Sequence, residues 1–91
     1  MFKIYGFDPT IYNCNPCNNA KRLLEARGID YEFVSVAKGV NDKGKPIIDS
    51  AVADEVSKRT GKSPLGMTMP QIFDEEKNVY VGGFDELRQY I

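Results

Sequence analysis

Alternating apolar and polar positions along the chain predict four β-strands. The first covers Phe2–Phe7, and the second covers Tyr31–Val36, which is rich in aromatic and β-branched residues. Two further strands, Gln71–Phe73 and Val79–Val81, are separated by a polar turn at 74–78. Because so short a connection reverses the chain, we expect the last two strands to form an antiparallel hairpin.

Apolar residues that recur every three or four positions predict three helices. The first begins at Cys17 and ends before Gly28, since glycine often terminates a helix. The second covers Ile47–Arg59, and the third covers Phe84–Ile91. Clusters of glycine, proline, asparagine and aspartate predict loops at 37–46 and 60–66, on either side of the second helix.

These elements follow one another in the order βαβαββα within a single domain of 91 residues. The first βαβ unit predicts a parallel strand pair, and the hairpin adds antiparallel strands. We therefore expect an α/β fold with a mixed four-stranded sheet flanked by helices. We also expect the chain to act as a monomer.

Composition and charge narrow the classes of function. Charged residues make up 27% of the chain and the formal net charge is −1, which argues against general binding to nucleic acid or membrane surfaces. The one local basic cluster, formed by Lys38, Lys43 and Lys45, includes Asp42 and is typical of a solvated loop. No apolar run is long enough to cross a bilayer, so we expect a cytoplasmic protein.

The two cysteines of the chain, Cys14 and Cys17, are its strongest chemical signal. They lie at the predicted start of the first helix, where unpaired N–H groups and the helix dipole favour a thiolate at Cys14. In a reducing compartment this spacing is more typical of redox catalysis or metal binding than of a structural disulfide. We expect Cys14 to be exposed and Cys17, one turn further along, to be shielded.

Several other chemistries lack the residues they need. A structural zinc site requires four cysteine or histidine ligands, whereas this chain has two cysteines and no histidine. We therefore expect no metal site within one chain. The absence of histidine also excludes Cys–His pairs and Ser–His–Asp triads as catalytic groups.

Three segments of the chain resemble those of one family. They read Cys-Asn-Pro-Cys at Cys14–Cys17, Thr-Met-Pro-Gln-Ile-Phe at Thr68–Phe73, and Gly-Gly-Phe-Asp-Glu-Leu at Gly82–Leu87. In this order, and with the predicted elements, they resemble glutaredoxins, which have the thioredoxin fold. The resemblance is greatest to the small glutaredoxins of T-even-type bacteriophages, also described as phage thioredoxins, and it covers essentially the whole chain. A phage-encoded protein would work in the host cytoplasm.

The resemblance implies a glutathione-dependent thiol-disulfide oxidoreductase, with glutathione as co-substrate and no bound cofactor. Cys14 would attack a mixed disulfide between a protein and glutathione, and either a second glutathione or Cys17 would release the product. The phage glutaredoxins point to ribonucleotide reductase as a client protein. The resemblance places the following residues at the glutathione groove: Tyr12, Asn13, Thr68, Met69, Pro70, Phe84 and Asp85.

The resemblance also implies a cis peptide bond before Pro70, which would turn the backbone of Met69 toward an extended peptide. Taken alone, Met-Pro before an apolar run is more typical of an ordinary strand start. Asp85 would pair with the α-ammonium group of glutathione. A helix cap is the alternative structural role for Asp85, and the two roles are compatible.

The chain departs from the glutaredoxin pattern in two places. Many glutaredoxins carry a cation shortly before the first cysteine, whereas Ile11–Asn13 contains none. Lys21, Arg59 and Lys62 are the candidates to replace it at the glycine carboxylate of glutathione. The second departure is Pro16, which precedes the second cysteine as it does in thioredoxins. We therefore predict an intermediate or more reducing potential than that of a typical glutaredoxin.

Two alternative functions remain open. In the first, the same disulfide chemistry is supplied with electrons by thioredoxin reductase instead of glutathione. In the second, the chain is a binding module in which two copies and two glutathione molecules hold an iron–sulfur cluster through Cys14.

Overall fold

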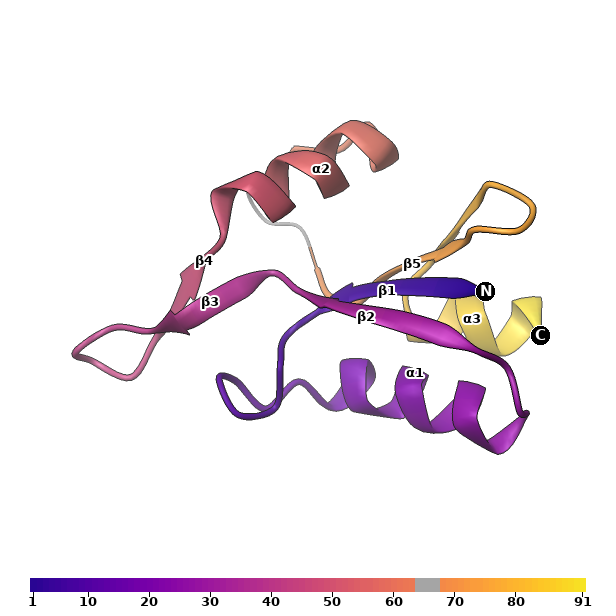
Figure 1. Cartoon of the computed structure of the whole chain (residues 1–91), viewed down its shortest axis with the longest axis horizontal. Helices are drawn as coiled ribbons and strands as arrows, with labels where there is room; N and C mark the ends of the chain where they lie inside the picture. The colour runs from indigo at the N-terminus through magenta and orange to yellow at the C-terminus, as the bar shows by residue number, and fades with distance from the viewer. Residues whose placement is uncertain (64–67) are drawn as a thin grey trace.

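The computed structural model describes residues 1–63 and 68–91, and its centre is a four-stranded sheet between layers of helices (Figure 1). The strands lie side by side in the order β2 (Tyr31–Ser35), β1 (Phe2–Gly6), β5 (Gln71–Asp74) and β6 (Val79–Gly82). β1 pairs with β2 in parallel, whereas β5 is antiparallel to both β1 and β6. The predicted mixed sheet and the predicted hairpin are confirmed.

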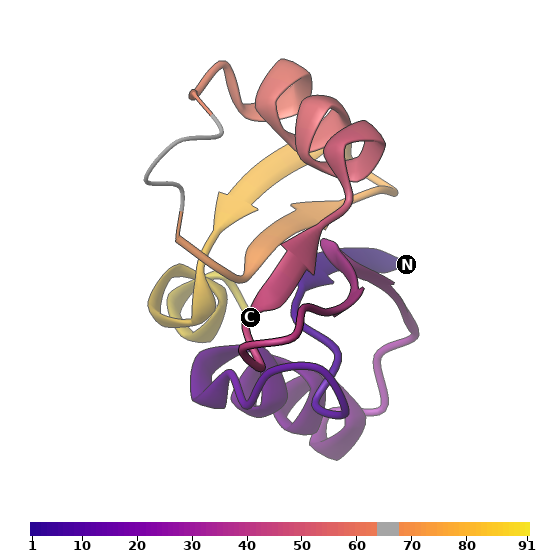
Figure 2. The ribbon, with the colours of Figure 1, turned by 90° about the vertical axis from the view of Figure 1, so that its left-hand side faces the viewer.

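Helices cover both faces of this sheet. Helices α1 (Asn15–Ala26) and α3 (Phe84–Tyr90) lie on one face and α2 (Ser50–Thr60) lies on the other, as Figure 1 and Figure 2 both show. Because neighbouring residues of a strand point to opposite faces, Ile4 packs toward α1 and α3 while Tyr5 packs toward α2. None of the helices in the described ranges is long and apolar enough to span a membrane.

Each face of the sheet has its own apolar core. The core beneath α1 and α3 contains six buried residues: Phe2, Ile4, Ala20, Leu24, Ile72 and Leu87. The core beneath α2 contains Tyr5, Val36, Val56 and Phe73, with Met69 and Tyr80 packed against it. The second core therefore touches Met69, a residue that the resemblance places at the candidate site.

The prediction of a loop at 37–46 is wrong. The chain there forms a second, two-stranded sheet from β3 (Ala37–Val40) and β4 (Pro46–Ile48), which projects from one end of the molecule (Figure 1). The side-chain oxygen of Asn41 accepts hydrogen bonds from the N–H groups of Lys43 and Lys45. Among the residues that resemble loop breakers, Asn41, Asp42 and Gly44 thus form the tight turn, whereas Gly39 and Pro46 belong to the two strands.

The second helix begins three residues later than predicted, at Ser50 instead of Ile47. Ile47 and Ile48 belong to β4, and Asp49 then caps the helix by accepting hydrogen bonds from the N–H groups of Ala51 and Val52. The apolar spacing that extends across 47–59 misses this boundary because isoleucine fits both a strand and a helix face. The far end of the predicted loop at 60–66 lies outside the described residues.

The first helix begins two residues earlier than predicted. Asn15 and Pro16 occupy its first turn, where proline is tolerated because that N–H has no partner inside the helix. The helix ends at Ala26, and Gly28 adopts the positive φ of 66° that is common just after a helix. The predicted end of this helix is confirmed.

The last helix is tied to the sheet by a buried carboxylate. Tyr90 at the end of α3 donates a hydrogen bond of 2.8 Å to Asp74 Oδ2, and the N–H groups of Glu76 and Lys77 donate to Asp74 Oδ1. The hydrogen bond from Tyr90, with those two backbone bonds, holds the pKa of Asp74 below its ordinary value. The start of α3 carries Asp85, so this tie also helps to hold a candidate site residue.

We expect Tyr90→Phe to lower the free energy of unfolding at neutral pH. Since the folded pKa of Asp74 lies below its unfolded value of 3.8, its stabilisation is present above pH 3.8 and is lost as pH falls through the folded pKa. The difference in the free energy of unfolding between wild type and variant should therefore become smaller below about pH 4. Urea unfolding across a pH series measures it. A difference that stays constant down to about pH 2 contradicts the role given to the Tyr90–Asp74 bond.

Candidate active site

Cys14 and Cys17 form a disulfide at the start of α1, and their Cα atoms lie 5.3 Å apart. Cys14 is the N-cap of the helix, and its Sγ accepts a hydrogen bond of 3.3 Å from the N–H of Cys17. When the disulfide is reduced, this N–H and the helix dipole both favour a negatively charged sulfur at Cys14. The position of the pair therefore suits a thiol that must become nucleophilic.

The two cysteines differ in their access to solvent. Cys17 is completely buried, whereas 7% of the surface of Cys14 is exposed to solvent. The expected shielding of Cys17 is therefore confirmed. The expectation that Cys14 is freely exposed is wrong. Its sulfur is bonded to Cys17 and also lies near the backbone of Met69, so little of the residue is left open to solvent.

Met69 brings a distant part of the sequence to the disulfide. Its carbonyl oxygen lies 4.0 Å from Cys14 Sγ, and the Met69–Pro70 peptide bond is cis, as the resemblance implied. Pro70 is buried, and its carbonyl oxygen lies 3.6 Å from the point where a Cβ on Gly83 would stand. Segments around Cys14, Met69 and Gly83 are thus neighbours in space.

The conformation of Gly82 sets the start of α3. Its φ is 118°, and an added Cβ would lie 2.9 Å from the Cγ of Glu86. Residues that carry a side chain rarely adopt such a φ, so glycine is required here. The carboxylate of Glu86 then accepts a hydrogen bond of 2.8 Å from the N–H of Gly83. This turn directs the helix that carries Phe84 and Asp85.

The remaining predicted site residues lie in three settings. Asp85 is exposed and pairs with Arg88 at 3.1 Å, while Phe84 packs against the core beneath α3. Tyr12 is 50% exposed, with the centroid of its ring 5.0 Å from that of Phe7.

Asn13 and Thr68, the last two predicted site residues, are exposed as well. Their oxygens accept hydrogen bonds from Asn18 at 3.3 Å and from Gln71 at 2.5 Å, respectively.

Two of the three candidate cations are engaged on the α2 side of the sheet. The guanidinium of Arg59 lies 3.9 Å above the ring of Phe73 and forms a 2.6 Å ion pair with Glu75. Lys62 donates a hydrogen bond of 3.2 Å to the hydroxyl of Tyr80. Arg59 is therefore paired with a carboxylate, whereas the hydroxyl that accepts from Lys62 carries no charge.

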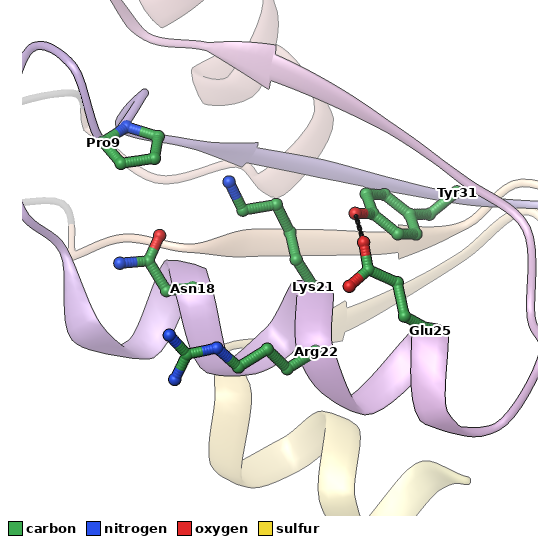
Figure 3. A pocket seen from close by; sticks show the side chains of 6 residues that line it. All are labelled: Pro9, Asn18, Lys21, Arg22, Glu25 and Tyr31. Carbon is green, nitrogen blue, oxygen red and sulfur yellow. Dashed lines mark hydrogen bonds between the residues drawn. The ribbon is translucent and has the colours of Figure 1, made fainter.

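Lys21, the third candidate cation, lines a pocket of about 340 Å³ beside α1 (Figure 3). Its amine lies 4.4 Å above the ring of Phe33. Across the pocket Tyr31 donates a hydrogen bond of 2.7 Å to Glu25, and burial together with this bond raises the pKa of Tyr31 to about 12. The pocket is lined by two cationic side chains, Lys21 and Arg22, and by the carboxylate of Glu25. Among its lining residues in the described part of the chain, Asn18 is the one that adjoins Cys17.

Sequence reasoning missed two residues close to the site. Gly6, at the end of β1, leaves space for Cys17: a Cβ there would lie 2.8 Å from Cys17 Sγ. An isolated glycine in a strand often marks such a close approach, so the signal was present. Gln71 is 3% exposed and bonds to the carbonyl of Thr68, a contact that its place in the Thr68–Phe73 motif does not reveal.

Comparisons with known proteins agree with this geometry. The family model named Glutaredoxin matches residues 3–79, which is most of the chain. A glutaredoxin of Enterobacteria phage T4 is 40% identical over 92 residues, covering 99% of this chain and 98% of the relative. The chain belongs to the glutaredoxin family.

Two further similarities extend this result. Glutaredoxin 1 of Rickettsia prowazekii is 33% identical over 78 residues, covering 86% of this chain and 67% of that protein. The crystal structure of a buckwheat glutaredoxin–glutathione complex superposes with a TM-score of 0.65 at 18% identity, covering 97% of this chain and 64% of the other. The thioredoxin fold expected from the sequence is confirmed, and this glutaredoxin is a thiol-disulfide oxidoreductase.

We expect Gly6→Ala to displace Cys17 Sγ, because the added Cβ meets both that sulfur and the ring of Phe33. Overpacking of this kind costs about 1–3 kcal/mol of stability. It should also lower the fraction of oxidised protein in a glutathione redox buffer. The matched control is Gly39→Ala in β3, where a Cβ meets no atom within 4 Å. Equal behaviour of the two variants would show that Gly6 does not seat the sulfur.

Proposed function

We propose that this glutaredoxin reduces protein disulfides and glutathione mixed disulfides with glutathione as its reductant. The observation that carries the proposal is the position of Cys14, which caps α1 and lies 4.0 Å from the carbonyl of Met69. A thiolate next to the backbone carbonyl of a segment outside the sheet suits a substrate that is itself a short cysteine-containing peptide. Glutathione has this chemistry.

The first step is an attack by the Cys14 thiolate on a glutathione mixed disulfide. A bond forms between Cys14 Sγ and the glutathione sulfur, the old disulfide bond breaks, and the client leaves as a thiolate. The N–H of Cys17 and the start of α1 stabilise the attacking anion. Because Cys14 keeps only a small exposed surface, the attack has a defined direction.

The intermediate on Cys14 can then be released in two ways. A second glutathione thiolate attacks the glutathione sulfur, which yields oxidised glutathione and restores the Cys14 thiolate. Alternatively, the Cys17 thiolate attacks Cys14 Sγ, expels the first glutathione as a thiolate and forms the Cys14–Cys17 disulfide. The second route also resolves a mixed disulfide with a client protein.

The groove residues have separate tasks in this proposal. The backbone of Met69 pairs with the extended peptide, and Asp85 receives the α-ammonium group. Tyr12 and Phe84 form apolar walls, while Asn13, Thr68 and Pro70 shape the ends of the groove. The solved buckwheat relative is a complex with glutathione, which supports this class of ligand. Lys62 and Lys21 remain the candidates for the glycine carboxylate.

A second electron source is favoured by one specific residue. Pro16, just before Cys17, gives the motif the proline of thioredoxins, so thioredoxin reductase could serve as a donor. Ribonucleotide reductase is the client that we propose on the basis of the resemblance to phage glutaredoxins. The reaction requires a supply of reduced glutathione, and we therefore place it in the cytoplasm.

The proposal is tested by comparing two reductase systems in one turnover assay. We expect wild type to reduce a cysteinyl-glutathione mixed disulfide with glutathione plus glutathione reductase, and more slowly with thioredoxin reductase alone. Cys14→Ser should abolish activity because it removes the nucleophile, whereas Cys17→Ser should retain the route through a second glutathione. Turnover with thioredoxin reductase only, or equal loss in both variants, contradicts the proposed function.

Asp85→Asn tests the ammonium site. We expect KM for the glutathione substrate to rise about tenfold with little change in kcat, since a hydrogen bond to a charged group contributes about 1.5–3 kcal/mol before screening by solvent. Arg88→Ala is the matched control because it removes the partner of Asp85 and keeps the carboxylate. If the control raises KM equally, the contribution of Asp85 is only structural.

A further inference from the structure

A chain of hydrogen bonds leads from the surface near α2 to the segment beside Cys14. Lys62 Nζ donates to the hydroxyl of Tyr80 at 3.2 Å, and this hydroxyl donates to Oε1 of Gln71. Nε2 of Gln71 then donates to the carbonyl of Thr68 at 2.5 Å. The chain joins β6, β5 and the residues that precede Pro70.

Gln71 is the central member of this chain, and it is buried. Only 3% of its surface is exposed, so both ends of its amide need partners within the protein. The hydroxyl of Tyr80 satisfies the oxygen, and the carbonyl of Thr68 accepts from the nitrogen. Because these partners are an O–H donor and a C=O acceptor, the amide has one favourable orientation.

Tyr80 is held in place from two directions. Its ring packs against that of Phe73, with centroids 5.1 Å apart, at the edge of the apolar core beneath α2. Lys62 contacts the same hydroxyl and lies 5.3 Å from the ring centroid. Since Lys62 is exposed, its contribution is small compared with that of the buried amide.

The bond to Thr68 matters because of the residue that follows it. Met69 places its carbonyl oxygen 4.0 Å from Cys14 Sγ, so a shift of Thr68 moves the backbone that faces the reactive sulfur. The side chain of Thr68 is exposed, and its carbonyl is already occupied by Gln71. Thr68 therefore serves as an anchor, which leaves the backbone of Met69 to meet a substrate.

We propose that Gln71 and Tyr80 are positioning residues that fix the Thr68–Met69 backbone opposite Cys14 and thereby set the affinity for cysteinyl peptides such as glutathione. The inference rests on the proposed function for its substrate. The two residues act through Met69 and take no part in the transfer of the disulfide. They should therefore control KM, and leave kcat and the titration of Cys14 unchanged.

The test uses Tyr80→Phe, Gln71→Met and the double variant in turnover with a cysteinyl-glutathione mixed disulfide. We expect KM to rise about fivefold in Tyr80→Phe and about tenfold in Gln71→Met, since a buried polar group is left unpaired or removed. The double variant should equal Gln71→Met, because the hydroxyl acts only through the amide. The pH profile of Cys14 alkylation should stay the same in all variants.

One control accompanies these variants. Tyr31→Phe removes a tyrosine hydroxyl that is bonded to Glu25 on the α1 side, and it should leave KM unchanged. If Tyr31→Phe raises KM as much as Tyr80→Phe does, the loss of either tyrosine hydroxyl has the same effect and the positioning role is overturned.

A readout without substrate separates this inference from the proposed function. Backbone N–H order parameters of Thr68 and Met69 in the reduced protein should fall from about 0.85 in wild type toward about 0.6 in Tyr80→Phe and Gln71→Met. This result stands even if wild type shows no turnover with glutathione, which would refute the proposed function alone. Unchanged order parameters overturn the inference. If Gln71→Met does not fold, Tyr80→Phe decides the question.

Discussion

The approach of Met69 to Cys14 is the contact on which the site depends. It joins the start of α1 to the segment that leads into β5, two parts of the chain 55 residues apart. The parallel β1–β2 pair and the antiparallel β1–β5 pair place these two segments at the same end of the sheet. A sulfur at a helix start, where a thiolate is favoured, thus faces the backbone that we propose to pair with a peptide.

Gly6, the last residue of β1, leaves the space that the sulfur of Cys17 occupies. Any side chain there would collide with the sulfur of Cys17, so the last residue of β1 must be small for the disulfide to close at this position. This packing agrees with the complete burial of Cys17, whereas Cys14 keeps a small exposed surface. The difference is consistent with the attacking role that we propose for Cys14 and the resolving role that we propose for Cys17.

Most of the fold was predictable because it rests on local patterns. Apolar residues alternate with polar ones in the strands of the main sheet, and α1 ends just before Gly28, a glycine that adopts a positive φ. The β3–β4 hairpin was not predictable in this way, because Asn41 converts apparent breakers into a turn. Likewise, the start of α2 depends on the cap at Asp49, since apolar spacing alone extends the helix into β4.

The sequence alone determined the chemistry: the Cys14–Cys17 spacing, the helix that begins there and the family to which the three motifs belong. The tertiary structure decided which groups surround the cysteine pair and which are bound elsewhere. It pairs Arg59 with Glu75, places Gly6 against Cys17 and joins Gln71 to Tyr80 by a hydrogen bond. Such contacts join residues distant in sequence. They depend on strand register and on which face of the sheet each helix covers, and no local pattern encodes either.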